Sequence, residues 1–279
     1  MAVADFAELA AAGRRPLSLR SVSLREGDTQ PTGNDTLLVT PQFIDNGSRA
    51  GRPEPEAGPT TADALAYSTD SARSVYHQAA ASGDVYVGAI GQSHVQSSTS
   101  ATFSQGLMID LLCVQGGLST SVTTSQTTNL PTAALPSRAT GGAGVWAAAY
   151  CSTSAASTDT TVTYTYTNQA GTGSQTTSHL WADTFADSSL VIIPFAPGDT
   201  GIRSIESVQL SAATGTGVWG VFLFKPLFCS AAVIGNQDFT RIGGWNSNIE
   251  DEAVLVWLST YQALSVGQTT ATTFSFFEA

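Results

Sequence analysis

The chain has 279 residues, of which only 12% are charged, and its formal net charge is −11. Because 42% of the residues are hydrophobic, this low charge indicates a folded chain with a neutral to acidic surface and excludes an intrinsically disordered one. An acidic body should repel nucleic acid, and no apolar run reaches the roughly 20 residues that a transmembrane helix needs. We therefore expect neither a direct nucleic-acid partner nor a membrane partner.

The beginning of the chain is predicted to form a helix. Residues 4–13 carry an apolar stripe that follows the N-cap candidate Asp5 and ends at Gly13. A helix this short is marginal in water, so we expect it to dock either on its own body or on a neighbouring chain.

An extended arm follows the helix and is positively charged. Four of the eleven basic residues lie at or before Arg25, in a chain that is otherwise acidic. The arm could grip an acidic surface or be solvated, and its apolar residues could pair as an added strand. We expect the helix and the arm to dock onto a neighbouring subunit. The candidate assembly residues are Phe6, Leu9, Arg14, Arg15, Leu17, Leu19, Arg20, Val22 and Arg25.

The arm and the body are separated by a linker. Residues 48–61 contain three prolines and two glycines, which preclude regular structure. We therefore divide the chain into an N-terminal part, residues 1–61, and a β-sandwich body, residues 62–279.

The body is predicted to contain about ten short strands separated by turn signals. The clearest strand is the first half of residues 160–173, in which threonines alternate with Val162, Tyr164 and Tyr166. No alternation of strands with helices occurs. The predicted fold class is mainly β: an antiparallel β-sandwich or jelly-roll-like body with an N-terminal helix and extended arm.

One carboxylate interrupts an apolar run. Asp110 lies within LMIDLLCV, residues 107–114, which is predicted to be a central strand. An unpaired buried carboxylate is costly, so Asp110 should face an arginine, the backbone or a subunit contact. The candidate partners are Arg138, Arg203 and Arg241.

A five-residue pattern, G-x-G-V-W, occurs at residues 142–146 and again at residues 215–219. Each copy opens an apolar strand. Equivalent strand-entry positions, or chance in a Gly-rich chain, explain the repeat equally well.

No motif indicates catalysis, a cofactor or a metal. The histidines lack zinc-binding spacing, no G-x-S-x-G is present, and the turn aspartates are expected to bond their own backbone. Calcium binding in the loops at residues 183–187 or 197–201 is the alternative. The cysteines are interpreted as buried small hydrophobes, with one internal disulfide left open. These residues are His77, His94 and His179, and Cys113, Cys151 and Cys229.

The strand at residues 160–173 also carries a resemblance. TVTYTYTNQAGTGSQTT, residues 161–177, resembles a segment of structural proteins of tailed-bacteriophage virions. In those proteins it is preceded by a Gly-rich entry into an apolar strand, here GGAGVWAAAYCS, residues 141–152. A second such entry, GTGVWGVFLFKPL at residues 215–227, and a C-terminal apolar strand, EAVLVWLSTYQ, follow. The resemblance covers residues 107–279.

The resemblance implies a non-enzymatic accessory component of a virion, assembled in the host cytoplasm. Its place could be a capsid decoration or cement protein, or a neck, collar or tail piece. The implied partners are further copies of itself and other virion proteins, such as the major capsid protein or neck and tail proteins.

The alternative is an adhesin-like module on a phage fibre or spike that binds a carbohydrate or a receptor. Of the five tryptophans, Trp245 is the one expected to be exposed, because it lies in the Gly-rich loop of residues 236–248. With Asn246, it forms the possible ligand loop.

Overall fold

The structure is a computed structural model that describes most of the body. The described residues are 16–25, 39–41, 66, 85–95, 103–128, 130, 135–153, 159–181, 190–233, 237–241, 248–261 and 269–278. They form fifteen strands and one 3-10 turn, η3 (Ser137–Ala139). The prediction of a mainly β, antiparallel fold is confirmed, while the predicted helix at residues 4–13 lies outside the described residues.

The strands pair into three antiparallel sheets. The first contains β1 (Pro16–Arg25), β15 (Thr269–Glu278), β3 (Val85–Val95) and β12 (Gln237–Arg241), with β13 (Asn248–Ile249) also paired to β3. The second contains β5 (Gln126–Thr127), β10 (Ile202–Leu210), β7 (Thr160–Asn168) and β8 (Gln175–Trp181). The third contains β2 (Val39–Pro41), β14 (Leu255–Tyr261), β4 (Phe103–Ser119), β11 (Val218–Val233), β6 (Trp146–Thr153) and β9 (Leu190–Ile192).

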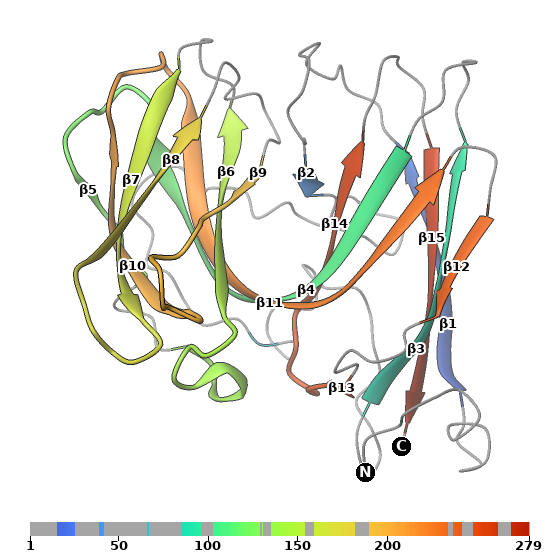
Figure 1. Cartoon of the computed structure of the whole chain (residues 1–279). Helices are drawn as coiled ribbons and strands as arrows, with labels where there is room; N and C mark the ends of the chain where they lie inside the picture. Colours follow the sequence, from blue (N-terminus) through green and yellow to red (C-terminus); the bar gives the residue numbers. More distant parts are fainter. Residues whose placement is uncertain are drawn as a thin grey trace.

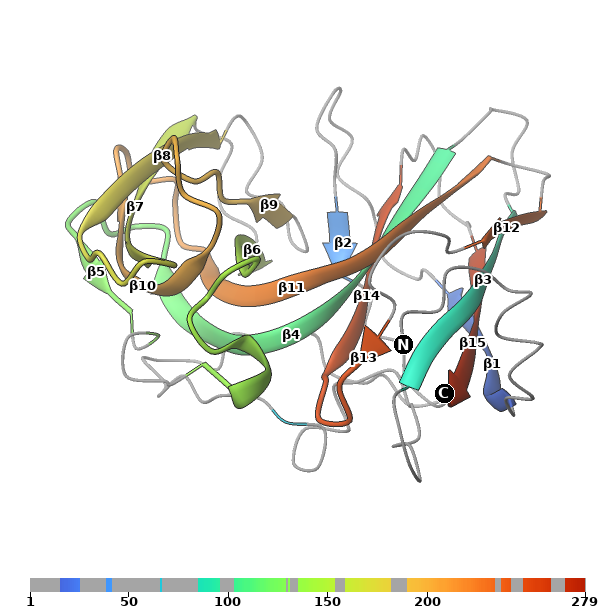
Figure 2. The same cartoon turned by 60° about the horizontal axis from the view of Figure 1, so that its bottom comes forward.

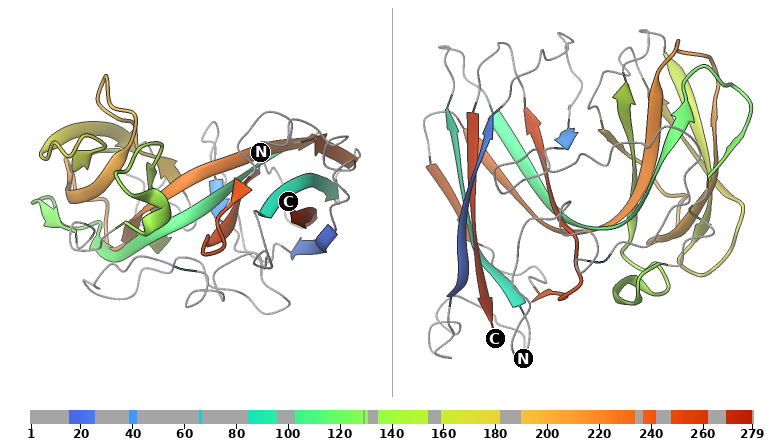
Figure 3. Two further views of the ribbon diagram at one scale, coloured as in Figure 1. Left: turned by 90° about the horizontal axis from the view of Figure 1, so that it is seen from below. Right: turned by 180° about the vertical axis from the view of Figure 1, so that it is seen from behind.

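Two long strands connect the molecule's two lobes. β4 and β11 are 17 and 16 residues long, and they bend as they pass from one lobe into the other (Figure 1). In the first lobe, the sheet of β5, β10, β7 and β8 lies opposite β6, β9 and the adjoining parts of β4 and β11. In the second lobe, the sheet of β1, β15, β3 and β12 lies on the outer side of β14 (Figures 2 and 3).

The third sheet changes partners near the middle of β4. The first part of β4 pairs with β14, and this pairing ends where Leu255 lies opposite Asp110. The next residue, Leu111, lies opposite Phe224 of β11, and Phe224 lies opposite Trp146, the first residue of β6. Asp110 is therefore the point at which the sheet passes from one lobe to the other.

The strand predicted from the alternating sequence is confirmed as β7. Val162, Tyr164 and Tyr166 are fully buried, and the threonines between them are half-buried on the outer face. The inner face of β7 packs on the third sheet. Beside it, Trp181 of β8 contacts Trp219 of β11 edge-on, with ring centroids 5.5 Å apart.

Both faces of the third sheet are buried around β4 and β11, which explains why their sequences are continuous apolar runs rather than alternating ones. One face contributes to the first-lobe core, and the opposite face forms a second cluster. That second cluster contains Ile109, Leu111, Ala148, Tyr150, Phe222, Phe224, Val254 and Val256.

The repeated G-x-G-V-W pattern does not mark equivalent positions. Trp219 is fully buried in the first-lobe core. Trp146 is 38% exposed and packs on Phe224, which belongs to the cluster on the opposite face.

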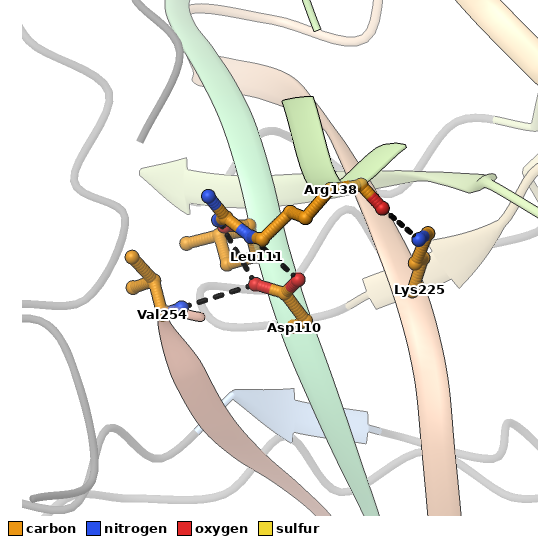
Figure 4. A network of polar contacts seen from close by, with 5 residues as sticks. All are labelled: Asp110, Leu111, Arg138, Lys225 and Val254. Atoms are coloured by element: carbon orange, nitrogen blue, oxygen red, sulfur yellow. Dashed lines mark hydrogen bonds and ion pairs between the residues drawn. The ribbon is translucent and has the colours of Figure 1, made fainter. Parts of the chain in front are cut away.

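Asp110 is paired as the sequence analysis required (Figure 4). Its Oδ2 accepts from Arg138 Nε at 2.8 Å and its Oδ1 accepts from an Arg138 terminal nitrogen at 3.0 Å, so the pair is bidentate. Val254 N donates to Oδ1 at 3.0 Å, and Lys225 Nζ donates to the Arg138 carbonyl. Burial raises the pKa of the Asp110 carboxyl, and the hydrogen bond and charge of Arg138 oppose this rise.

We predict that Arg138→Met lowers the free energy of unfolding by about 3–5 kcal/mol, because it leaves a buried carboxylate without its counter-ion. Urea denaturation measures the loss. Arg138→Lys is the matched control: it keeps the charge but loses the bidentate geometry, so its loss should be smaller.

The deficit of Arg138→Met should also depend on pH. Without Arg138, the pKa of Asp110 rises further above its ordinary value of 3.8, so the folded chain binds a proton more tightly than the unfolded chain. Stability relative to the wild type therefore falls as the pH rises from the folded-state pKa of Asp110 in the wild type, which is already above 3.8, to the higher folded-state pKa in the variant, and the deficit is smallest below that window. A deficit that is equal at acid and neutral pH would contradict this account.

Candidate functional site

Two of the segments that carry the sequence resemblance are joined at one end of the first lobe by a third turn. The turn at residues 197–201 contacts both the β7–β8 turn at residues 168–174 and the Gly-rich turn at residues 141–144. Gln169 N donates to the Gly201 carbonyl at 3.0 Å, and Gly144 N donates to the Thr200 carbonyl at 3.2 Å. We call these three turns the turn cluster.

Asp199 ties two of the turns together through side chains of β7. Tyr166 Oη donates to Asp199 Oδ2 at 2.6 Å, and Asn168 Nδ2 donates to Asp199 Oδ1 at 2.8 Å. Ala196 N donates to Tyr166 Oη at 2.8 Å, so the phenol both donates and accepts. Burial, together with the hydrogen bond to Asp199, raises the pKa of Tyr166.

Two charged side chains of β10, Arg203 and Glu206, are hydrogen-bonded to the turn cluster. Arg203 donates to the carbonyls of Gln169 and Gly141, with its shortest bond at 2.8 Å. Glu206 Oε1 accepts from Thr167 Oγ1 at 2.7 Å and from Ser174 N at 3.1 Å. These charges therefore serve to hold the turns in place.

Two glycines allow the turns to approach closely. A Cβ on Gly201 would lie 2.1 Å from the Gly142 carbonyl oxygen, and a Cβ on Gly142 would lie 2.5 Å from the Ile202 carbonyl oxygen. Gly142 also has a φ of 71°, which disfavours other residues. The Gly-rich sequence at residues 141–144 signalled a tight turn, but nothing local indicated its partner.

The role of Asp199 differs from the one that its sequence predicts. A turn aspartate was expected to bond its own backbone, whereas both carboxylate oxygens of Asp199 accept from side chains more than 30 positions earlier in the chain. The alternating pattern of β7 placed Tyr166 inside, and a buried tyrosine hydroxyl needs a partner. The need of the buried Tyr166 hydroxyl for a partner was the one sign of this hydrogen bond in the sequence, although it did not identify Asp199 as that partner.

The predicted assembly residues fall into two groups. Leu17, Leu19, Arg20, Val22 and Arg25 lie on β1, which pairs with β15 of the same chain from Pro16 to Arg25. This part of the arm thus adds a strand to a sheet of its own body, and its docking on a neighbouring subunit stays a prediction. The remaining predicted residues, Phe6, Leu9, Arg14 and Arg15, and the ligand-loop residues Trp245 and Asn246, lie outside the described residues.

Two cysteine side chains and one histidine side chain are described. Cys113 and Cys151 are buried and are not joined in a disulfide, and burial raises the pKa of Cys113 to about 12. His179 is half-buried on β8, and burial lowers its pKa. Within the described part of the chain, no group of three or more His, Cys, Asp or Glu could hold a metal ion, and no helix is long and apolar enough to span a membrane.

No protein-family model matches the chain, and no curated protein matches it. Among solved structures, the chain is similar to a crystal structure of the VP2 subviral particle of infectious bursal disease virus, with 11% identity, 99% of this chain and 83% of that chain covered, and a TM-score of 0.19. A structure of the viral particle of the same virus has 11% identity, coverage of 95% and 78%, and a TM-score of 0.17. Likeness at these scores carries no conclusion about fold or function.

The two buried tyrosines of β7 allow a matched test of the turn cluster. Tyr166 bonds Asp199 and Ala196, whereas the Tyr164 hydroxyl has no hydrogen-bond partner among the described residues. We predict that Tyr166→Phe lowers the free energy of unfolding by about 1–3 kcal/mol and that Tyr164→Phe is neutral or stabilising. Urea denaturation of both variants measures the difference, and equal losses would contradict the structural role of Asp199.

Proposed function

We propose that this protein is a non-enzymatic structural component of a virion, of the tailed-bacteriophage type that its sequence resembles. Its function would be to assemble with further copies of itself and with other virion proteins, as a capsid decoration or cement protein or as a neck, collar or tail piece. It would be assembled in the host cytoplasm and be located in the virion.

The observation that supports this proposal is the structural use of the resembling segments. Residues 141–152 and 161–177 are joined in the turn cluster through residues 200–203, to which both segments are hydrogen-bonded. Their polar groups are engaged in hydrogen bonds that hold turns, and Asp199, Arg203 and Glu206 bond to neighbouring strands and turns. Because these segments hold turns together, their resemblance to phage structural proteins supports a similar architecture rather than a similar enzymatic reaction.

The surface of the first lobe is consistent with a packing role. The outer face of β7 presents half-buried threonines, among them Thr161, Thr163 and Thr165, and β8 adds the exposed Thr176 and Ser178. This face offers hydrogen-bonding and methyl groups without net charge, which suits contact with another protein subunit.

The proposal is tested by locating the chain in native particles. We expect intact, purified virions from a culture that produces this protein to contain it in a fixed copy number, and antibody-gold labelling to mark one place on the head, the neck or the tail. A chain that is absent from intact particles, while present in the lysate, would contradict the proposal.

The assembly arm has a separate test, for which β1 sets the boundary. Removing residues 1–15 leaves β1 and its pairing with β15, so the body should stay folded. We expect the truncated protein to keep the wild-type circular dichroism spectrum and to lose incorporation into particles. Normal incorporation of the folded truncation would show that residues 1–15 are not needed for assembly.

A further inference from the structure

The edges of the sheets are protected unequally. An edge strand exposes unpaired N–H and C=O groups, and proteins block such edges by keeping them short or by placing charges and prolines on them. β5 has two residues, and β2 and β9 have three each. β1 carries Pro16, Arg20 and Arg25, and β12 carries Asp238 and Arg241.

β8 has none of these protections. It has seven residues, QTTSHLW, without a charged carboxylate, lysine, arginine or proline. Its register with β7 runs from Gln175 to Trp181 without a bulge, whereas the β10–β7 register shifts twice. The outer edge of β8 is therefore regular and uncharged, and no described strand pairs with it.

The side chains next to this edge are also incompletely covered. Gln175, Thr177 and His179 point inward but are only half-buried, although the residues opposite them on β7 are fully buried. On the outer side, Leu180 is 55% exposed, the largest value among the exposed large hydrophobic residues of the described chain. The flank of the first lobe at β8 is thus open to contact.

We propose that β8 pairs with β8 of a second copy of this chain, antiparallel and across a two-fold axis. An antiparallel pair of identical edges is self-complementary, because each copy offers the same donors and acceptors in reverse order. The chain carries a net charge of −11, so two copies repel each other over most of their surface. An uncharged edge of this length lets two acidic chains meet with their main-chain groups paired.

The pairing centres on Ser178, the middle residue of β8. In that register, Thr176 of each copy lies opposite Leu180 of the other, on the outer face where both side chains are now exposed. The contact would cover Leu180 and join the two four-stranded sheets into one continuous sheet. This dimer goes beyond the proposed virion role, since it requires no other virion protein.

Light scattering after size-exclusion chromatography tests the dimer on the full chain. The wild type should have about twice the chain mass of 28.8 kDa, or a higher even multiple of it. Ser178→Lys and Ser178→Asp each place like charges opposite each other at the two-fold axis, so each should halve that mass. An equimolar mixture of the two variants should restore it, because the charges are then opposite.

Thr163→Lys is the matched control. Thr163 lies opposite Ser178 in the β7–β8 register and is half-buried on the same outer face, but it is one strand in from the edge. It should leave the wild-type mass unchanged. If Ser178→Lys fails to fold, Leu180→Lys places a lysine on the same edge at a more exposed position and should also halve the mass.

Four results would overturn the proposal. The first two are a wild-type protein that is monomeric or has an odd number of chains, and folded Ser178 variants that keep the wild-type mass. The other two are an equimolar mixture of the Ser178 variants that stays dissociated, and a Thr163→Lys variant that dissociates, which would indicate that the copies stack through the threonine face. Since particle incorporation is measured separately, a monomeric wild type that is found in virions would overturn the dimer and leave the proposed function standing.

Discussion

The architecture depends on how one buried carboxylate is neutralised. Asp110 lies where the shared sheet loses β14 and gains β6, and its oxygens bind Val254 N, which leads into β14, and Arg138, in η3 ahead of β6. Elements of both lobes therefore converge on one side chain. A buried ion pair is seldom more stabilising than apolar residues of the same volume, but its geometry permits few alternatives. We infer that Asp110 fixes the register of β4 against its neighbours at the point where a slip would misalign both lobes.

Because the two lobes share one sheet, the sequences of its two long strands are constrained. The middle of β4 and of β11 must be apolar on both faces, because one face belongs to the first-lobe core and the other to the cluster that includes Phe222 and Phe224. The strands must also bend, and register shifts occur along β11 at Trp219, Phe224 and Pro226. Bulges of this kind bend a strand while keeping most of its ladder.

Local patterns in the sequence predicted the parts of the structure that local forces decide. The alternation around Tyr164 gave β7 with the correct inner face, and the cost of burying Asp110 required a partner that proved to be Arg138. The pairing of β1 with β15 and the reach of Asp199 to Tyr166 were not predictable in the same way, since each joins segments distant in the chain that no periodicity relates. β4 extends beyond the strand predicted at residues 107–114, because the glycines that signal strand ends lie within this bent strand, and Pro226 likewise lies within β11.

Several charged side chains are already hydrogen-bonded within the fold, which limits the kinds of contact the molecule can make with a partner. In the turn cluster, Asp199, Arg203 and Glu206 are already bonded, and Asp110, Arg138 and Lys225 are bonded in the shared sheet. At β7 and β8, the first lobe presents outward a face of threonines and an uncharged strand edge. Association through main-chain hydrogen bonds and methyl groups depends little on counter-ions, whereas the repulsion between acidic bodies is screened by salt. Self-association of this chain should therefore strengthen as ionic strength rises, the opposite of an interface built from ion pairs.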